Sequence, residues 1–449
     1  MAQLVPTDEN DLTKADASPT KAFFVEIITK DIQLDEAIQD LVDNCIDGAK
    51  RLRPGTDADY NGLWIELTVG TGGFKIHDNC GGIPLDIARK YAFKFGRAKG
   101  FQRTSHSVGQ FGVGMKRALF KMGDHFNVAS VEPQHSFRIE VDVPTWADDD
   151  LNWDFDIKDL VTAPQPVDQL GTKIDINILD PAVAETFGQV AFLTKLRHDI
   201  RVVQQHPMRL GLRIALNGQA IIPTEWQLKE GEGIAPAFQR FEDQLGGTSP
   251  LVTRVYAGVG ESSRPHAGWY VFCNGRCILE ADQESTTGWS EVSDQGVGVP
   301  KYHGQFARFR GYAFLDSDDS SILPWNTTKT GLDLESDAYR RLRGRLIEIT
   351  RGVIDFLNSL DAETEMEDGD KVLSQAISAA PAIALEKLRE RPTFVYTPPP
   401  KRGPSLARIS FKKPQAEADK LKEALSAKSN QQLGEMSFDY AYTNLVEED

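Results

Sequence analysis

The segment from residue 40 to residue 47 has the periodicity of an amphipathic helix. Its polar residues Asp40, Asn44 and Asp47 are separated by four and three positions, so they share one face of a helix. Apolar residues fill most of the other positions, namely Leu41, Val42, Cys45 and Ile46. The pattern predicts a helix that directs two acids and an amide toward one place.

Later segments also show regular spacing of apolar residues. Isoleucine alternates from Ile174 to Ile178, which predicts a half-buried strand, and helical spacing predicts a helix over 186–205. Asn217-Gly218 is typical of a hairpin turn. The other expected elements are strands near 210–216, 251–259, 269–273 and 309–315, and helices over 335–359, 371–390 and 415–436.

Two glycine-rich segments follow the acidic helix. Asp78-Asn-Cys-Gly-Gly-Ile-Pro84 places an acid at an expected strand end, before a turn. Gly109-Gln-Phe-Gly-Val-Gly114 leads into an expected helix, an arrangement whose backbone N–H groups bind phosphate. An amide oxygen is a hard ligand for Mg²⁺, and an acid can orient or deprotonate a water. The three segments in this order favour a magnesium–nucleotide site.

Each segment also has a simpler interpretation. An acidic stripe on a helix is commonly a solvated face, and Asp-Asn-Cys-Gly-Gly is commonly only a turn. Gly-x-x-Gly-x-Gly occurs often by chance, and it is neither the Rossmann nor the P-loop pattern, since no Gly-Lys-Ser/Thr follows it. The prediction therefore depends on the three segments together.

Together, the segments resemble the GHKL superfamily, which includes gyrase B, the ninety-kilodalton heat-shock chaperones, histidine kinases and MutL. Residues 109–115 are similar to the chaperone version, and Lys116 is similar to the MORC ATPases. The resemblance covers about residues 25–180 and extends less specifically to about 335. It implies a Bergerat fold that binds ATP and Mg²⁺.

The resemblance also implies roles for individual residues. Asn44 corresponds to the magnesium ligand, Asp78 to the carboxylate that accepts the adenine amino proton, and Gly82 to the glycine beside the base. Thr172 corresponds to the threonine that supports the adenine-binding acid through water. The implied nucleotide-binding set is Asn44, Asp47, Asp78, Gly82, Ile83, Gly109, Gln110, Phe111, Gly112, Val113, Gly114, Lys116 and Thr172.

Two positions depart from the family pattern. Most relatives place a glutamate as general base four residues before the asparagine, whereas this chain has the shorter Asp40, so we expect slow hydrolysis. Asp43 is a rival base, although it lies one residue before Asn44 and should point elsewhere. Cys80 stands where glycine is usual, and we interpret it as a small packing residue rather than a redox group.

A loop lysine is the second candidate catalytic residue. Lys329, in Pro324-Trp-Asn-Thr-Thr-Lys-Thr-Gly331, is similar in position to the transducer lysine that touches the γ-phosphate in MutL and gyrase B. Its charge could stabilise the transferred phosphoryl group. The alternative is a surface lysine. In either case we expect folding not to depend on Lys329, because its loop is polar.

These features predict an α+β protein with a Bergerat ATP-binding domain, described in the family as a two-layer α/β sandwich. A MutL/gyrase-like α/β transducer domain and a helical C-terminal tail should follow. The expected boundaries are an arm at 1–24, the ATP-binding domain at 25–185, the transducer at 186–335, a helical segment with an acidic linker at 336–390, and a proline-rich linker and tail at 391–449.

Composition agrees with a water-soluble protein. The 449 residues carry 50 basic and 66 acidic side chains, and the net charge of −16 argues against indiscriminate nucleic-acid binding. A local basic site could still involve Arg340–Arg345 or the basic residues of 401–413, although nearby acids favour a solvated helix face for the first. Four cysteines and no long apolar run or signal peptide favour the cytoplasm, with no membrane partner.

The preferred function is an ATP-gated switch. The resemblance implies ATP binding, slow hydrolysis, an ATP-dependent homodimer, and DNA-linked work in genome maintenance or phage defence with a protein effector such as a nuclease or helicase. The alternatives are a chaperone-like remodeller of a protein client and a regulatory subunit that binds nucleotide without hydrolysis. A histidine kinase is disfavoured, because only about 25 residues precede the expected core.

Overall fold

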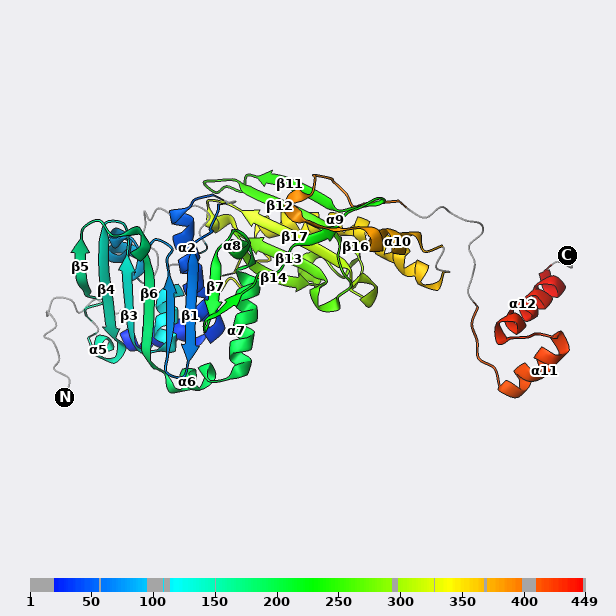
Figure 1. Ribbon diagram of the computed structural model, residues 1–449, viewed down its shortest axis with the longest axis horizontal. Helices are drawn as coiled ribbons and strands as arrows, with labels where there is room; N and C mark the ends of the chain where they lie inside the picture. Colours follow the sequence, from blue (N-terminus) through cyan, green and yellow to red (C-terminus); the bar gives the residue numbers. More distant parts are fainter. Residues whose placement is uncertain are drawn as a thin grey trace, which may run out of the picture. The chain divides into compact units, whose positions relative to one another are not determined.

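The computed structural model describes residues 20–55, 58–94, 108, 114–149, 151–292, 298–326, 328–366, 370–397 and 409–446. The chain divides into two compact units, residues 1–398 and 399–449, and each is described by itself (Figure 1). Helices and strands are mixed along the first unit, which confirms the α+β prediction.

The first sheet has eight strands in the order β5-β4-β3-β6-β2-β1-β7-β8. All neighbours are antiparallel except β1 and β7. The strands are β1 (Trp64–Gly70), β2 (Gly73–Asp78), β3 (Gly123–Val131), β4 (His135–Asp142), β5 (Ile157–Thr162), β6 (Gly171–Leu179), β7 (Arg213–Leu216) and β8 (Gln219–Ile221). The sheet therefore continues past residue 185, the expected end of the ATP-binding domain.

Helices cover one face of this sheet. In β1 and β2 every second residue is buried, and the residues between them, such as Glu66 and Lys75, are exposed, because only one face packs on helices. The longer covering helices are α1 (Lys21–Lys30), α2 (Leu34–Leu52), α4 (Gly114–Met122) and α7 (Val190–Val203). Shorter helices are α3 (Leu85–Ile87), α5 (Val143–Ala147), α6 (Pro181–Phe187) and α8 (Gln205–Arg209).

Helix α2 carries the candidate site and has a well-defined start. Gln33 and Glu36 form a capping box, and acids occupy the first turn, where they interact favourably with the helix dipole. Apolar side chains of α2, including Ile38 and Val42, join one core cluster with the strands and α4. Burial of this face holds the helix against the sheet.

The second sheet has five strands in the order β11-β12-β17-β13-β14. They are β11 (Ala237–Asp243), β12 (Leu251–Val259), β13 (Gly268–Cys273), β14 (Arg276–Asp282) and β17 (Phe309–Asp316). Helix α9 (Asp337–Ala362) packs on one face, and an aromatic cluster around Trp226 and Phe272 packs on the other. Because both faces are covered, every residue of β13 and β17 is buried.

Small elements complete the first unit. They are the strands β9 (Gln227–Lys229), β10 (Ile234–Ala235), β15 (Glu291–Val292), β16 (Gly298–Val299), β18 (Ala382–Ala384) and β19 (Val395–Tyr396), and the helix α10 (Val372–Ala379). The predicted helix over 371–390 is wrong beyond residue 379. Ala380 caps the helix and Pro381 follows it. A proline lacks the N–H that a continuing helix needs, and residues 382–384 pair with β9 instead.

The second unit contains α11 (Gln415–Leu425) and α12 (Asn430–Val446), where one helix over 415–436 was predicted. Ser426 adopts a left-handed backbone conformation, with φ of 54°, and this ends α11. Among the residues that the structure describes, no helix combines the length and the apolar character needed to span a bilayer.

Candidate functional site

The expected nucleotide residues from four separate segments line one small pocket. The pocket contains Asn44 from α2, Asp78 from the end of β2, Gly82 and Ile83 from the following turn, and Thr172 from β6. The other lining residues are Leu41, Cys45, Gly48, Arg51, Ile76, Cys80, Met115 and Ile174. The exposed Asn44 side chain stands among largely apolar neighbours, an arrangement typical of small-molecule sites.

Asp78 is the buried acid of this pocket, with 3% of its surface exposed. Burial raises its pKa to about 6, although hydrogen bonds from the backbone of Cys80 and Thr172 and from the Cys45 side chain oppose the rise. The Cys80 N–H donates to Asp78 Oδ1 at 2.7 Å. The carboxylate is thus fixed in orientation, and Thr172 contacts it directly through the backbone.

The turn after β2 is held closely against β3. A Cβ added at Gly82 would lie 2.2 Å from the carbonyl oxygen of Val131, and Gly82 has a left-handed φ of 72°, so only glycine fits. The Ile83 N–H donates to Ser130 Oγ at 2.7 Å. Cys80 is 1% exposed and packs in the same core cluster as α2, as its interpretation as a packing residue requires.

Asp40 lies outside this pocket and is bound by two cations. Arg117 of α4 donates to Asp40 Oδ2 at 2.8 Å, and Lys329 donates to Asp40 Oδ1 at 3.1 Å. The first residue of α4, Gly114, packs on the same carboxylate, because a Cβ there would lie 2.8 Å from Asp40 Cγ. The structure therefore shows a candidate base with both of its oxygens in ion pairs.

Asp43 is also ion-paired, to the same lysine. Lys329 Nζ lies 2.9 Å from Asp43 Oδ2, Arg276 pairs with that oxygen, and Gln204 donates to Oδ1 at 2.9 Å. Burial raises the pKa of Asp43, but the charges of Arg276 and Lys329 overcome this and hold it far below its usual range. A carboxylate with such a low pKa is a poor proton acceptor at neutral pH, which disfavours Asp43 as the rival base.

The environment of Lys329 differs from the sequence-based expectation. Only 6% of the residue is exposed, so the surface alternative is wrong. Burial lowers its pKa, but Asp43 and Asp40 more than compensate and raise it above the ordinary value. Its backbone has a φ of 58°, a conformation that costs a lysine roughly 1–2 kcal/mol and that the surrounding contacts stabilise. The expectation that folding is independent of Lys329 therefore does not fit its contacts.

The glycine-rich loop is described only at its ends. Gly109, Gln110, Phe111, Gly112 and Val113 lie outside the described residues. Gly114 and Lys116 belong to α4, and Lys116 Nζ donates to the carbonyls of Ala92 and Lys94 at 2.9 and 2.7 Å. Burial lowers the pKa of Lys116 to about 7.

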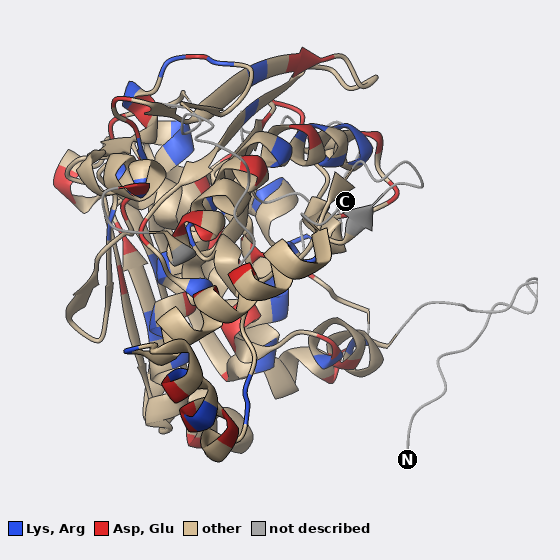
Figure 2. Ribbon diagram, turned by 90° about the vertical axis from the view of Figure 1, so that its right-hand side faces the viewer, with Lys and Arg blue, Asp and Glu red and all other residues tan. Residues whose placement is uncertain are grey.

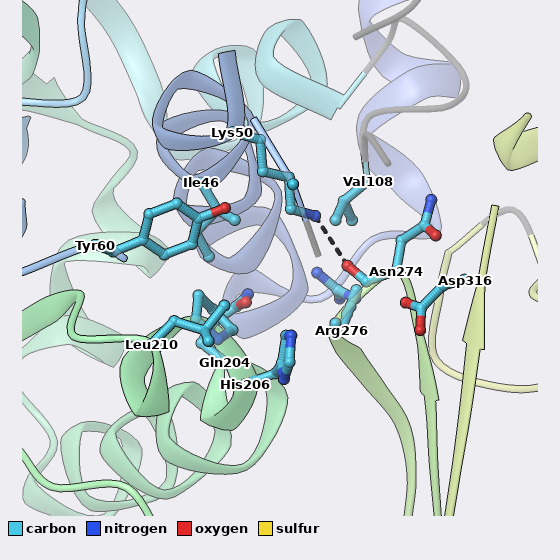
Figure 3. A pocket seen from close by; sticks show the side chains of 13 residues that line it. Ile46, Lys50, Tyr60, Val108, Gln204, His206, Leu210, Asn274, Arg276 and Asp316 are labelled. Carbon is cyan, nitrogen blue, oxygen red and sulfur yellow. Dashed lines mark hydrogen bonds between the residues drawn. The ribbon is translucent and has the colours of Figure 1, made fainter. Parts of the chain in front are cut away.

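A second pocket lies between α2, α8 and the β13–β14 turn (Figure 3). Lys50 donates across it to the Asn274 carbonyl at 2.8 Å. His206, Arg276 and Asp316 also line it. Asp47, which was expected to bind nucleotide, instead accepts a hydrogen bond from the Val108 N–H at 2.8 Å and lines neither pocket.

The arginine run of α9 is occupied by internal contacts. Arg341 and Arg345 both bind Asp243, and Arg340 pairs with Asp337. Figure 2 shows basic and acidic residues interspersed along the described ribbon. The structure thus favours a helix face whose arginines pair with acids of α9 and β11 over a nucleic-acid site.

Sequence reasoning missed three arginines. Arg117 binds Asp40, Arg276 binds Asp43, and Arg51 Nη2 donates to the Gly82 carbonyl at 3.4 Å. Arg117 and Arg51 each stand beside a recognised motif, and Arg276 follows an Asn-Gly turn. Their places beside the motifs were a weak signal, because each of these contacts joins residues that are distant in the chain.

Comparison with protein families agrees with this geometry. Residues 32–170 match the model for the histidine kinase-, DNA gyrase B- and HSP90-like ATPases. This segment is a GHKL-type ATPase domain. The match confirms the superfamily inferred from the three motifs, and it includes α2, the Asp78 turn and the glycine-rich loop. No curated protein matches the chain.

The residues of the GHKL domain fit a magnesium nucleotide. Among the described residues, no group of three or more His, Cys, Asp or Glu side chains could hold a metal by itself. Mg²⁺ commonly takes few protein ligands and completes its shell with phosphate oxygens and water. The exposed amide of Asn44 at the pocket suits that role. The bound ion would neutralise phosphate charge.

Proposed function

We propose that the protein binds Mg-ATP, hydrolyses it slowly, and changes between open and closed states with the nucleotide. Asp78 accepts the adenine amino group, and Asn44 holds the metal. Asp40 orients or deprotonates the attacking water. The observation that carries the proposal is the pocket that brings Asn44, Asp78, Gly82 and Thr172 together.

The contacts of Lys329 join the second sheet to the GHKL domain. This lysine belongs to the loop after β17 and α9 follows it, yet its ammonium reaches two acids of α2 in the GHKL domain. A lysine at this place can respond to the γ-phosphate. Of ATP and ADP, only ATP carries that charged group. The closed state is proposed to be a homodimer.

The biological setting is also a proposal. By its resemblance to MORC and MutL, the switch acts in DNA-linked work, in genome maintenance or phage defence, with a nuclease or helicase partner. The arginine run of α9 does not support a DNA contact there, since its members bind Asp243 and Asp337. Lys412 and Lys413, which are exposed in the second unit, are better candidates.

Two measurements test this function. The first is phosphate release from ATP by the full chain, with Asp40→Asn as the control for contaminating ATPases. The second is capture of protein and nucleic acid from the native host in the presence of ADP or a non-hydrolysable ATP analogue. Absence of both nucleotide binding and phosphate release would refute the proposal.

A further inference from the structure

Five charged side chains, four of them buried and Arg117 partly exposed, form one network between the GHKL domain and the second sheet. They are Asp40, Asp43, Arg117, Arg276 and Lys329, joined by the ion pairs described above. Asp43 and Arg276 are 1% and 3% exposed in their side chains. Since desolvated charges are costly unless paired, each member depends on its partners.

Lys329 is the shared cation of the network. Asp40 has a second cation in Arg117, and Asp43 has a second cation in Arg276. If Lys329 leaves, each carboxylate therefore keeps one arginine. Lys329 is thus the one cation of these three that bonds to both acids, and its departure leaves two complete ion pairs behind.

Departure of Lys329 would also change Asp40. Arg117 holds Oδ2 of Asp40, whereas Lys329 occupies Oδ1. Without the lysine, Oδ1 becomes available to accept a hydrogen bond from water, while Arg117 still fixes the carboxylate.

We propose that Asp43, backed by Arg276, is a positioning residue that holds Lys329 on Asp40 until a nucleotide γ-phosphate takes the lysine. This inference rests on the proposed function and deepens it. Asp43 and the γ-phosphate compete for the ammonium of Lys329. Without ATP, the ammonium therefore stays on Oδ1 of Asp40, the proposed base. Transfer of Lys329 from the two acids to the γ-phosphate frees Oδ1 of Asp40 and moves the loop that connects β17 to α9.

The competition predicts a specific effect of Asp43→Asn. The amide keeps an oxygen for Gln204 but removes the charge that attracts Lys329. Affinity for a non-hydrolysable ATP analogue should therefore rise relative to affinity for ADP, by about 10- to 150-fold, the contribution of one charge-assisted hydrogen bond. ADP affinity itself should change little, because ADP has no γ-phosphate to bind the lysine.

A double-mutant cycle identifies the lysine as the cause. In a Lys329→Met background, Asp43→Asn should leave the analogue-to-ADP ratio unchanged. Calorimetry on the four full-length proteins with both nucleotides gives the ratios. Asp43→Asn could raise the analogue-to-ADP affinity ratio equally with and without Lys329. In that case general electrostatic repulsion explains the rise, and transfer of Lys329 to the phosphate is refuted. An unchanged ratio in Asp43→Asn with Lys329 present refutes it as well.

A measurement on the unaltered protein covers the case in which Asp43→Asn does not fold. Hydrogen exchange of residues 328–336 should differ between the ADP and analogue complexes, because the lysine must change partners. Equal exchange in both complexes would overturn the inference. Failure of the unaltered protein to bind either nucleotide would instead refute the proposed function, so the two failures are distinguishable.

Discussion

Lys329 Nζ lies 2.9 Å from Asp43 Oδ2, although the two residues are 286 positions apart in the chain. The contact joins α2 of the GHKL domain to the loop that precedes α9. Together with the ion pair between Arg276 and Asp43, it connects α2 with the second sheet. Energetic coupling between sites requires an element that both can bias, and this ion pair is a candidate for that element.

The first prediction concerns the adenine pocket. Asp78→Asn should weaken ATP binding by about 1–3 kcal/mol, or roughly 5- to 150-fold, because an amide is a mismatched partner for the adenine amino group. GTP should bind the unaltered protein less tightly than ATP. Titration calorimetry of both proteins is the test. Equal ATP affinities would reject the assignment of Asp78.

The second prediction concerns pH. Since burial raises the pKa of Asp78 from 3.8 to about 6, the folded state binds its proton more tightly than the unfolded state does. The unaltered protein should therefore lose stability relative to Asp78→Asn as pH rises from about 4 to about 6. The loss should approach about 3 kcal/mol, at 1.36 kcal/mol per unit. Urea unfolding of both proteins across this range measures it. A difference in stability that does not change with pH would contradict the shift.

The third prediction concerns the base. Asp40→Asn should lower turnover by about 100-fold or more, as expected when a general base is lost, and leave ADP binding nearly intact. Steady-state hydrolysis and ADP titration separate the two effects. If Asp40→Asn turns over ATP at the unaltered rate while Asp43→Asn is inactive, the wrong acid has been assigned.

The fourth prediction uses two glycines with matched backbones. Gly82 and Gly218 have φ of 72° and 73°, yet an added Cβ meets the Val131 carbonyl at Gly82 and nothing within 4 Å at Gly218. Gly82→Ala should lower the melting temperature more than Gly218→Ala and should also weaken ATP binding, because only Gly82 lines the pocket. Thermal unfolding with and without ATP is the measurement. Similar losses at both positions would show that backbone strain alone matters.

The fifth prediction concerns Lys329. Lys329→Ala should lower stability by roughly 3 kcal/mol, at the low end for loss of one partner of a buried ion pair, because two arginines remain beside the acids. It should bind ADP but fail to dimerise with a non-hydrolysable ATP analogue. Light scattering after size-exclusion chromatography is the test, with exposed Lys301→Ala as the control.

Two results would contradict this prediction in different ways. A Lys329→Ala protein that still dimerises with the analogue would reject the sensor role of the lysine. An unaltered protein with the same mass in ADP and in the analogue would reject the nucleotide-dependent dimer itself. Only a contact that differs between the two nucleotides can shift such an equilibrium.

The motifs predicted the fold class and the superfamily of the first domain correctly. Helical spacing around Asp40 and Asn44 and the two glycine-rich segments predicted a nucleotide site, and the resemblance of these segments to the GHKL superfamily predicted the domain. Such motifs can be read from sequence because their residues are neighbours in the chain. The same reasoning predicted the helices now seen as α7 and α9 and the strands β12, β13 and β17. It failed over 380–390, where pairing with β9 decides the structure.

Tertiary structure alone decided which charges meet. The sequence could not indicate that Lys329 is buried, or that Asp43 binds Arg276 rather than pointing to solvent, since these pairs span more than 200 positions. Nor could it separate Asn44, which lines the same pocket as Asp78, from Asp40, which lies in the ionic network. Such contacts depend on how α2 and the second sheet pack, and that packing arises from burial of both apolar cores.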